Sequence, residues 1–524
     1  MSTRPAAGRS GPSLAGPRRV RFGPRTAAVV VAAALVALAG ASLVAASSLA
    51  TSGARRIGAD VPVDRAVAGD VLRFDANNSP SLARSPVDPA RMAVANRIDA
   101  PRFGCALHVS SDGGATWQPS AIPFPAGEEN PPRCFAPDVA FGADGTLHVL
   151  FATLYGSGNR PHAVWLSSST DGGKTLSEPR RVLGELSFQA RLAADPAVPA
   201  RLYVTWLQAT DTAYLAFPTT GNPIELARSD DGGRTWTDPV RVSPGTRQRV
   251  VAPALRAGPK GRLYLSYLDL GDDRLDYDGG HQGRGGPAYA GAWSLVLARS
   301  GDDGRTWSES VVADDIAPPE RFVVFLPPTP SLAVDPAGRH VYLAFHSARS
   351  GDADVFAWSS GDGGRTFLRR RVNDTPARDG RDQYLPQLSL AGDGRLDVVY
   401  YDRRADPRNG RNGVSLQSST DGGRSFARHV AVSNRSFDAG IGFGSERGMA
   451  DLGSRLALVS ARHSVLAVWP DTRAGTQGTS KQDLAQAVVR IDEASAWAPP
   501  LRALGVVLLL AAVVAVAATR RRPS

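Results

Sequence analysis

The sequence contains few cysteines and few lysines, and the small number of cysteines excludes some kinds of functional site. Its 524 residues include two cysteines, and three lysines stand beside 57 arginines. Two isolated cysteines supply no spacing for a cysteine metal site or a catalytic cysteine motif. What is abundant instead is turn-forming residues, with 54 glycines and 39 prolines in a chain that is 42% hydrophobic. This composition is typical of a large all-β body with many turns.

Acidic residues are absent from both ends of the chain. Residues 1–26 hold six arginines and no acid, and residues 501–524 hold four more arginines and no acid. These ten charges account for the formal net charge of +10, so the body between them is neutral. A basic excess confined to the termini excludes a nucleic-acid groove in the body.

Both basic ends adjoin apolar runs. Residues 27–50 carry no charge and predict a transmembrane signal anchor, with a long signal peptide as the alternative. Residues 501–519 predict a C-terminal transmembrane helix, followed by a basic tail at 520–524. The positive-inside rule places both basic tails, 1–26 and 520–524, in the cytoplasm. The chain is therefore expected at a cell membrane, with its body on the extracytoplasmic side of a bacterial envelope.

One octapeptide recurs six times, as Ser-x-Asp-x-Gly-x-Thr/Ser followed by an aromatic residue or, once, Leu176. Its aspartates are Asp112, Asp171, Asp231, Asp302, Asp362 and Asp421. Their separations are 59, 60, 71, 60 and 59 residues, and such a period indicates a repeat architecture. Asp, Gly and Ser are turn residues, and each copy lies between two strand-like runs, so each is predicted to be a hairpin turn.

This octapeptide resembles the Asp-box, or BNR, repeat of the sialidase-like β-propellers. The resemblance implies a propeller of four-stranded antiparallel blades over residues 57–492, with the boxes as structural turns away from the active-site face. Six units carry a box. A seventh unit without one supplies strands at residues 449–452, 465–469 and 484–489, with residues 61–67 as its fourth strand. Seven blades are therefore predicted, with six as the alternative.

In such a propeller Cys105 and Cys134 lie at the same end of adjacent blades, which predicts a disulfide in an extracytoplasmic protein. Two buried thiols are the alternative.

The residues with chemistry are expected on the loops opposite the boxes, where arginines gather. Sialidases hold the substrate carboxylate with three arginines and use a Tyr nucleophile, a Glu partner and an Asp acid/base. Arg97-Ile98-Asp99 is similar to the family's Arg-Ile-Pro phrase but lacks its proline, and the resemblance implies roles for Arg97 and Asp99. Loop position adds further candidates: Tyr384 and Tyr401 as nucleophile, Glu446 as its partner, and Arg403, Arg404 and Arg447 as carboxylate ligands.

An anion site requires Arg97, Arg403 or Arg404, and Arg447 to converge within about 5 Å of one position. Pairing of these arginines with aspartates would instead remove the exo-sialidase interpretation. The leading hypothesis is a propeller that binds a glycan or an envelope protein through this face. An exo-α-sialidase or related glycoside hydrolase acting on acidic sugars is the alternative. No metal site or cofactor is predicted, apart from a weak calcium alternative near Asp272, Asp276 and Asp278.

Overall fold

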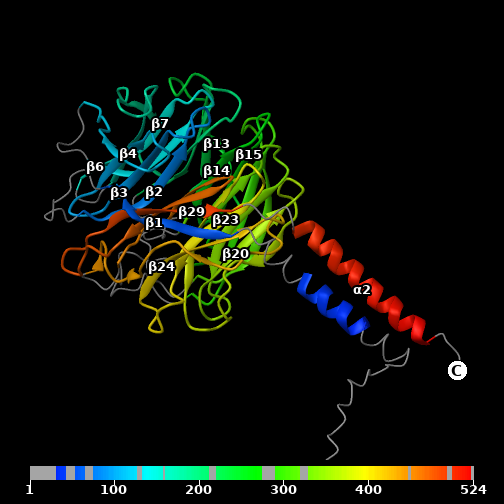
Figure 1. Ribbon diagram of the computed structural model, residues 1–524. Helices are drawn as coiled ribbons and strands as arrows, with labels where there is room; N and C mark the ends of the chain where they lie inside the picture. Colours follow the sequence, from blue (N-terminus) through cyan, green and yellow to red (C-terminus); the bar gives the residue numbers. More distant parts are fainter. Residues whose placement is uncertain are drawn as a thin grey trace, which may run out of the picture. The chain divides into compact units, whose positions relative to one another are not determined.

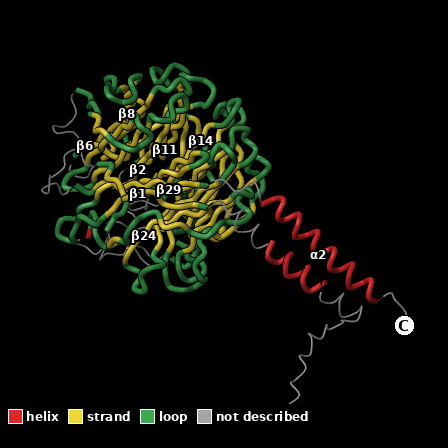
Figure 2. Tube along the Cα trace, viewed as in Figure 1, coloured by secondary structure: helices red, strands yellow, loops and turns green. Residues whose placement is uncertain are grey.

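The computed structural model describes residues 31–42, 53–64, 75–126, 133–156, 160–211, 220–273, 289–318, 328–445, 450–492 and 498–520. These fall into two compact units, one of residues 54–491 and one made of the two ends of the chain. The larger unit nearly coincides with the propeller predicted over residues 57–492. Strands are its regular structure throughout (Figure 2).

Seven antiparallel sheets make up the larger unit (Figure 1). Blades 1 to 3 contain the following strands: β2 (Asn77–Arg84), β3 (Met92–Ile98), β4 (Gly104–Ser110), β5 (Gln118–Ser120); β6 (Arg133–Phe141), β7 (Leu147–Tyr155), β8 (Arg160–Ser169), β9 (Arg180–Leu183); β10 (Ser187–Ala194), β11 (Leu202–Gln208), β12 (Ile224–Ser229), β13 (Val240–Arg241). Blades 4 and 5 contain β14 (Val250–Ala257), β15 (Leu263–Asp269), β16 (Trp293–Ser300), β17 (Ser308–Ile316); β18 (Ser331–Val334), β19 (Val341–Ser347), β20 (Asp354–Ser360), β21 (Leu368–Arg371). Blades 6 and 7 contain β22 (Gln383–Leu390), β23 (Leu396–Asp402), β24 (Arg411–Ser419), β25 (Val430–Ala431), β26 (Phe437–Asp438); β27 (Ala457–Ala461), β28 (Ser464–Asp471), β29 (Asp483–Ile491), β1 (Ala54–Pro62). The all-β propeller and its seven blades are therefore as predicted.

Strand β1 closes the ring. It pairs antiparallel with β29, from Ala54 opposite Ile491 to Pro62 opposite Ala485, and the two strands lie side by side in Figure 1. The closing strand was expected at residues 61–67 and lies at 54–62, paired with β29 on both sides of a bulge between Ile57 and Val61. Residues 65–67 lie outside the described residues. Since the outer strand of blade 7 comes from the other end of the chain, this blade has no hairpin between its third and fourth strands. That is why seven blades carry six boxes.

Five of the innermost strands share a β-bulge, which contains a proline in every one of them except β10. Pairing shifts register between Asn78 and Ser81 in β2, and likewise in β6, β10, β14 and β22. A residue with positive φ sits in each bulge, such as Ser79 at 51°. In blade 7, Gly453 at 87° precedes β27. The strand expected at 449–452 therefore begins only at Ala457, because this positive-φ residue interrupts regular pairing.

The box turn of blade 3 shows how the octapeptide works. Ser229 Oγ accepts a 2.8 Å hydrogen bond from Gly233 N, and Asp231 accepts bonds from Thr235 N at 2.9 Å and Thr235 Oγ1 at 2.6 Å. The bond from the Thr235 hydroxyl is foremost in lowering the pKa of Asp231. Gly233 has φ of 83°, and a Cβ there would collide with Leu166 of blade 2. The box is thus a structural turn fitted against the neighbouring blade.

The apolar ends of the chain contain two described helices, residues 31–42 and α2 (Ala498–Arg520). Among the described residues, no helix has both the length and the hydropathy needed to cross a membrane. The prediction of two transmembrane helices is therefore not supported. The remainder of the first apolar run and most of both basic tails lie outside the described residues.

Cys105 in β4 and Cys134 in β6 form a disulfide with Cα atoms 5.4 Å apart, linking blades 1 and 2. The bridge closes a loop with a sequence separation of 29 residues. The loop-closure model then gives a loss of about 3–4 kcal/mol of unfolding free energy for the variant with both cysteines replaced by alanine. Urea denaturation of the two proteins measures this difference. A loss below about 1 kcal/mol would contradict a stabilising role for the bridge.

Candidate functional site

Strand direction places the candidate residues at one end of the propeller. The box turns join third and fourth strands, so they lie at the same end as the turns between first and second strands. The linkers that enter each first strand, and the loops between second and third strands, lie at the opposite end, here called the loop face. Loops held by a rigid scaffold commonly carry binding sites.

Arg97, at the end of β3, is buried and pairs with two carboxylates. One of its terminal nitrogens lies 2.7 Å from Asp99 Oδ2 and 2.8 Å from Asp451 Oδ2. Asn78 donates a further 2.8 Å hydrogen bond to Asp99. Because Asp451 belongs to the segment that enters blade 7, this cluster ties blade 1 to blade 7. It leaves Arg97 no exposed face for a substrate carboxylate.

Asp99 has an unusual carboxyl group. Burial raises its pKa, Arg97 opposes that rise, nearby Asp451 adds to it, and the result is about 6. A raised pKa suits a proton donor. However, Asp99 is only 3% exposed, so a substrate does not reach it in this structure.

Tyr384 and Arg403 form a second buried network, in blade 6. Arg403 donates to Asn412 Oδ1 at 3.0 Å and to the Tyr384 hydroxyl at 3.2 Å, and it lies 3.5 Å from Asp382. Burial raises the pKa of Tyr384, although Arg403 opposes the effect. A lowered pKa or an adjacent general base activates a nucleophilic phenol, and the raised pKa of Tyr384 does not favour that role.

Tyr401 is fully buried, and its hydroxyl donates a 3.0 Å hydrogen bond to the carbonyl of Pro470 in blade 7. Burial raises its pKa well above the ordinary value. Its ring packs against Tyr384 and Phe437, with centroids 5.4 and 5.8 Å away. The surroundings of Tyr401 are those of a core residue.

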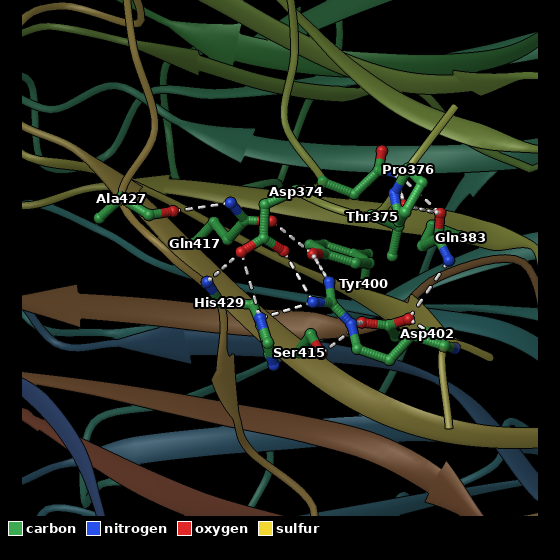
Figure 3. A network of polar contacts seen from close by, with 12 residues as sticks. Asp374, Thr375, Pro376, Gln383, Tyr400, Asp402, Ser415, Gln417, Ala427 and His429 are labelled. Atoms are coloured by element: carbon green, nitrogen blue, oxygen red, sulfur yellow. Dashed lines mark hydrogen bonds and ion pairs between the residues drawn. The ribbon is translucent and has the colours of Figure 1, made fainter. Parts of the chain in front are cut away.

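Arg404 is the centre of a partly exposed network between blades 5 and 6, here called the 5/6 seam. Figure 3 shows Asp374, Tyr400, Asp402 and His429 gathered there. Arg404 pairs with Asp402, lies 2.7 Å from Asp374 and donates to the Tyr400 hydroxyl at 3.2 Å. The Arg404 and Asp374 side chains are 20% and 30% exposed. Burial would raise the pKa of Asp374, but hydrogen bonds from Arg404 and His429 outweigh it and lower the pKa to about 2.

The three described arginines of the predicted carboxylate site are therefore compensated by aspartates. Arg97, Arg403 and Arg404 face five acids: Asp99, Asp451, Asp382, Asp402 and Asp374. Arg97 lies between blades 1 and 7, Arg403 within blade 6, and Arg404 in the 5/6 seam. Each contacts its own carboxylates, so they do not present one joint anion site. Excess negative charge around them disfavours an acidic sugar.

The remaining candidates lie outside the described residues in whole or in part. Glu446 and Arg447 are not described, and of the calcium candidates only Asp272 is described. No group of three or more His, Cys, Asp and Glu side chains suited to a metal occurs in the part of the chain that the structure describes.

A search confined to loops misses three arginines that line the centre of the ring: Arg191 in β10, Arg256 in β14, and Arg455 just before β27. Arg191 and Arg455 each stand two positions after the positive-φ residue of the phrase repeated at the innermost strands, which is Gln189 in blade 3 and Gly453 in blade 7. A comparison of that phrase across the seven units would have identified those two.

Part of the chain is similar to known proteins. Residues 199–447 match the family model of the BNR repeat-like domain. The Xyloglucanase Xgh74A of Acetivibrio thermocellus is 26% identical over 222 residues, which are 39% of this chain and 24% of that protein. Among solved structures, a protein of unknown function from Dyadobacter fermentans is 17% identical with a TM-score of 0.45, over 84% of this chain and 99% of that one. The Trypanosoma rangeli sialidase is 13% identical with a TM-score of 0.41, over 68% and 58%.

Proposed function

We propose that this seven-bladed propeller, which matches the BNR repeat-like domain over residues 199–447, binds glycan outside the cytoplasm and does not cleave terminal acidic sugars. The observation that carries this proposal is the pairing of Arg97, Arg403 and Arg404 with aspartates. An exo-sialidase needs arginines free to hold a carboxylate, and these are already neutralised within the protein. A disulfide between blades 1 and 2 supports the extracytoplasmic location.

The 5/6 seam is the proposed contact with sugar. Asp374, Arg404 and His429 are partly exposed there, and together they offer both acceptors and donors for sugar hydroxyls. With two carboxylates around one guanidinium, the seam suits a neutral saccharide better than an acidic one. The xyloglucanase likeness, although it spans only 24% of that enzyme, supports a polysaccharide as ligand.

The test combines binding and hydrolysis on the purified chain. We expect retardation in native gels containing xyloglucan, and no release of fluorophore from a 4-methylumbelliferyl sialoside. Asp374→Ala removes an acceptor held by charged partners, so xyloglucan affinity should fall about tenfold, equivalent to about 1.4 kcal/mol. The control Asp238→Ala, an exposed residue on the box side, should bind as the wild type does.

Two outcomes would overturn the proposal. Sialoside hydrolysis that Tyr384→Phe or Tyr401→Phe abolishes would establish the exo-sialidase alternative and those tyrosines as its nucleophile candidates. Equal xyloglucan affinity in Asp374→Ala and the wild type would remove the 5/6 seam from sugar recognition.

A further inference from the structure

A cavity of about 490 Å³ lies on the axis of the propeller, lined by the innermost strands of all seven blades. Its lining contains eight alanines, whose small side chains leave the space open: Ala83, Ala140, Ala193, Ala194, Ala254, Ala257, Ala333 and Ala457. With about 30 Å³ per water molecule, this axial channel has room for roughly sixteen waters or for a small hydrated ligand.

The channel has a strong excess of positive charge. Arg191, Arg256 and Arg455 reach it from blades 3, 4 and 7, and Arg84 lies on the wall contributed by blade 1. Asp138 is the only acidic side chain among the described residues that line it. Arginines therefore outnumber acidic residues in the channel, whereas on the loop face aspartates outnumber the candidate arginines.

Asp138 does not neutralise this excess. Its carboxylate accepts hydrogen bonds from Ser81 Oγ and from Leu192 N, the latter at 3.0 Å, so both oxygens are occupied. Its distance to the nearest Arg455 nitrogen is 3.9 Å, longer than a hydrogen bond. One weak ion pair therefore faces four guanidinium groups.

The three central arginines are bonded mainly to backbone carbonyls. Arg191 donates to Thr329 Oγ1 at 2.8 Å, and Arg256 donates to the Leu255 carbonyl at 2.9 Å. Arg455 donates to the carbonyls of Pro80 and Pro137 at 3.0 and 2.9 Å. A guanidinium carries more N–H donors than these bonds use, and none of these bonds neutralises its charge.

Uncompensated like charges that lie close together are costly, and the pKa values of the arginines reflect this cost. Burial lowers the pKa of Arg191, and the nearby Arg256 charge lowers it further, against an opposing effect of Asp138. The protein atoms around Arg256 lower its pKa as well, although this residue is exposed to the water of the channel. An anion between these groups would relieve both the desolvation and the mutual repulsion.

We propose that the axial channel is a binding site for a small tetrahedral oxyanion, phosphate or sulfate, held by Arg191, Arg256 and Arg455. Guanidinium groups bind such oxyanions with paired charge-assisted hydrogen bonds. The site is separate from the glycan contact at the 5/6 seam, so either proposal can fail without the other.

The test measures anion binding to the full chain. Equilibrium dialysis with labelled phosphate, at constant ionic strength set by chloride, should give saturable binding near one anion per chain. Thermal melting should show a rise with phosphate or sulfate that acetate, N-acetylneuraminate and chloride do not produce. Of the two oxyanions, the one giving the larger rise at equal concentration identifies the preferred ligand.

Arg256→Gln is the decisive variant, because the one hydrogen bond of this side chain goes to the adjacent backbone. It should lower phosphate affinity at least tenfold and leave the melting temperature in chloride unchanged or higher, since it removes a repelling charge. The control Arg349→Gln alters a 62% exposed arginine outside the channel and should bind phosphate normally. Absence of saturable binding, wild-type affinity in Arg256→Gln, or equal stabilisation by acetate would each overturn the proposal.

Discussion

Replacing Arg97 with methionine should lower the free energy of unfolding by about 3–5 kcal/mol at pH 7.5, the usual result when one partner of a buried ion pair is removed. Arg97 is 3% exposed and is the cation that both Asp99 and Asp451 contact. Without it, the two carboxyl groups stay buried between blades 1 and 7 and lose the guanidinium that lies 2.7 Å from one and 2.8 Å from the other. Urea denaturation of wild type and variant measures the difference.

This loss should depend on pH. The folded pKa of Asp99, about 6, lies above its ordinary value near 3.8. Its contribution to stability is therefore fully present below about pH 4 and is lost as pH rises through about 6. Removal of Arg97 makes ionisation of the buried carboxyls costlier still, so the gap between variant and wild type should widen from pH 4 to pH 7.5.

Two controls separate this explanation from simple loss of packing. Arg97→Met combined with Asp451→Asn should recover part of the lost stability at pH 7.5, because one buried carboxylate is gone. Arg349→Met, at a 62% exposed position, should change stability by less than about 0.5 kcal/mol. A loss in Arg97→Met that is the same at pH 4 and pH 7.5 would contradict an electrostatic role for Arg97.

Removal of β1 is expected to have a comparable or larger effect. A chain that begins at Asp75 loses six paired positions with β29, and at about 1 kcal/mol for each hydrogen bond the loss is on the order of 5 kcal/mol. The melting temperature should fall by about 10 °C or more. Arg56 also donates a 2.8 Å hydrogen bond to the Val432 carbonyl, so the contact of β1 with blade 6 is lost as well.

The matched control is a chain that begins at Gly53 and keeps β1 whole. It should melt like the longer protein, whereas the chain that begins at Asp75 should also aggregate, because β29 becomes an exposed sheet edge. Light scattering and calorimetry distinguish the two. Equal melting temperatures for both truncations would show that the ring does not depend on β1.

The fold could be predicted from the sequence because the motif that identifies it is formed by residues close together in the chain. Each box contains its own turn: Ser229, Asp231 and Thr235 bond one another within seven residues, so the repeat is legible without knowledge of the neighbouring blades. The strand pattern of the sequence predicted the seventh blade, but it did not predict where the strands of that blade begin and end. Residue Gly453 interrupts its first strand, and β1 pairs earlier than expected.

The candidate site was less accessible because it depends on contacts between distant segments. Arg97 is compensated by Asp451, which lies 354 residues away, and Arg404 by Asp374 as well as by adjacent Asp402. The sequence of an arginine-rich loop does not show whether its guanidinium groups pair with carboxylates elsewhere in the fold. Only the packing of one blade against the next decided which of them keep an unbalanced charge.

The sequence alone determined a box-containing propeller, because each box is a short-range hydrogen-bonded turn repeated at a regular period. The tertiary structure alone decided where positive charge remains. Closure of seven blades around one axis brings Arg191, Arg256 and Arg455 to one channel from segments far apart in the chain. Aspartates of the same or the neighbouring blade neutralise Arg97, Arg403 and Arg404. Electrostatic balance depends on distance in space, and ring closure sets that distance.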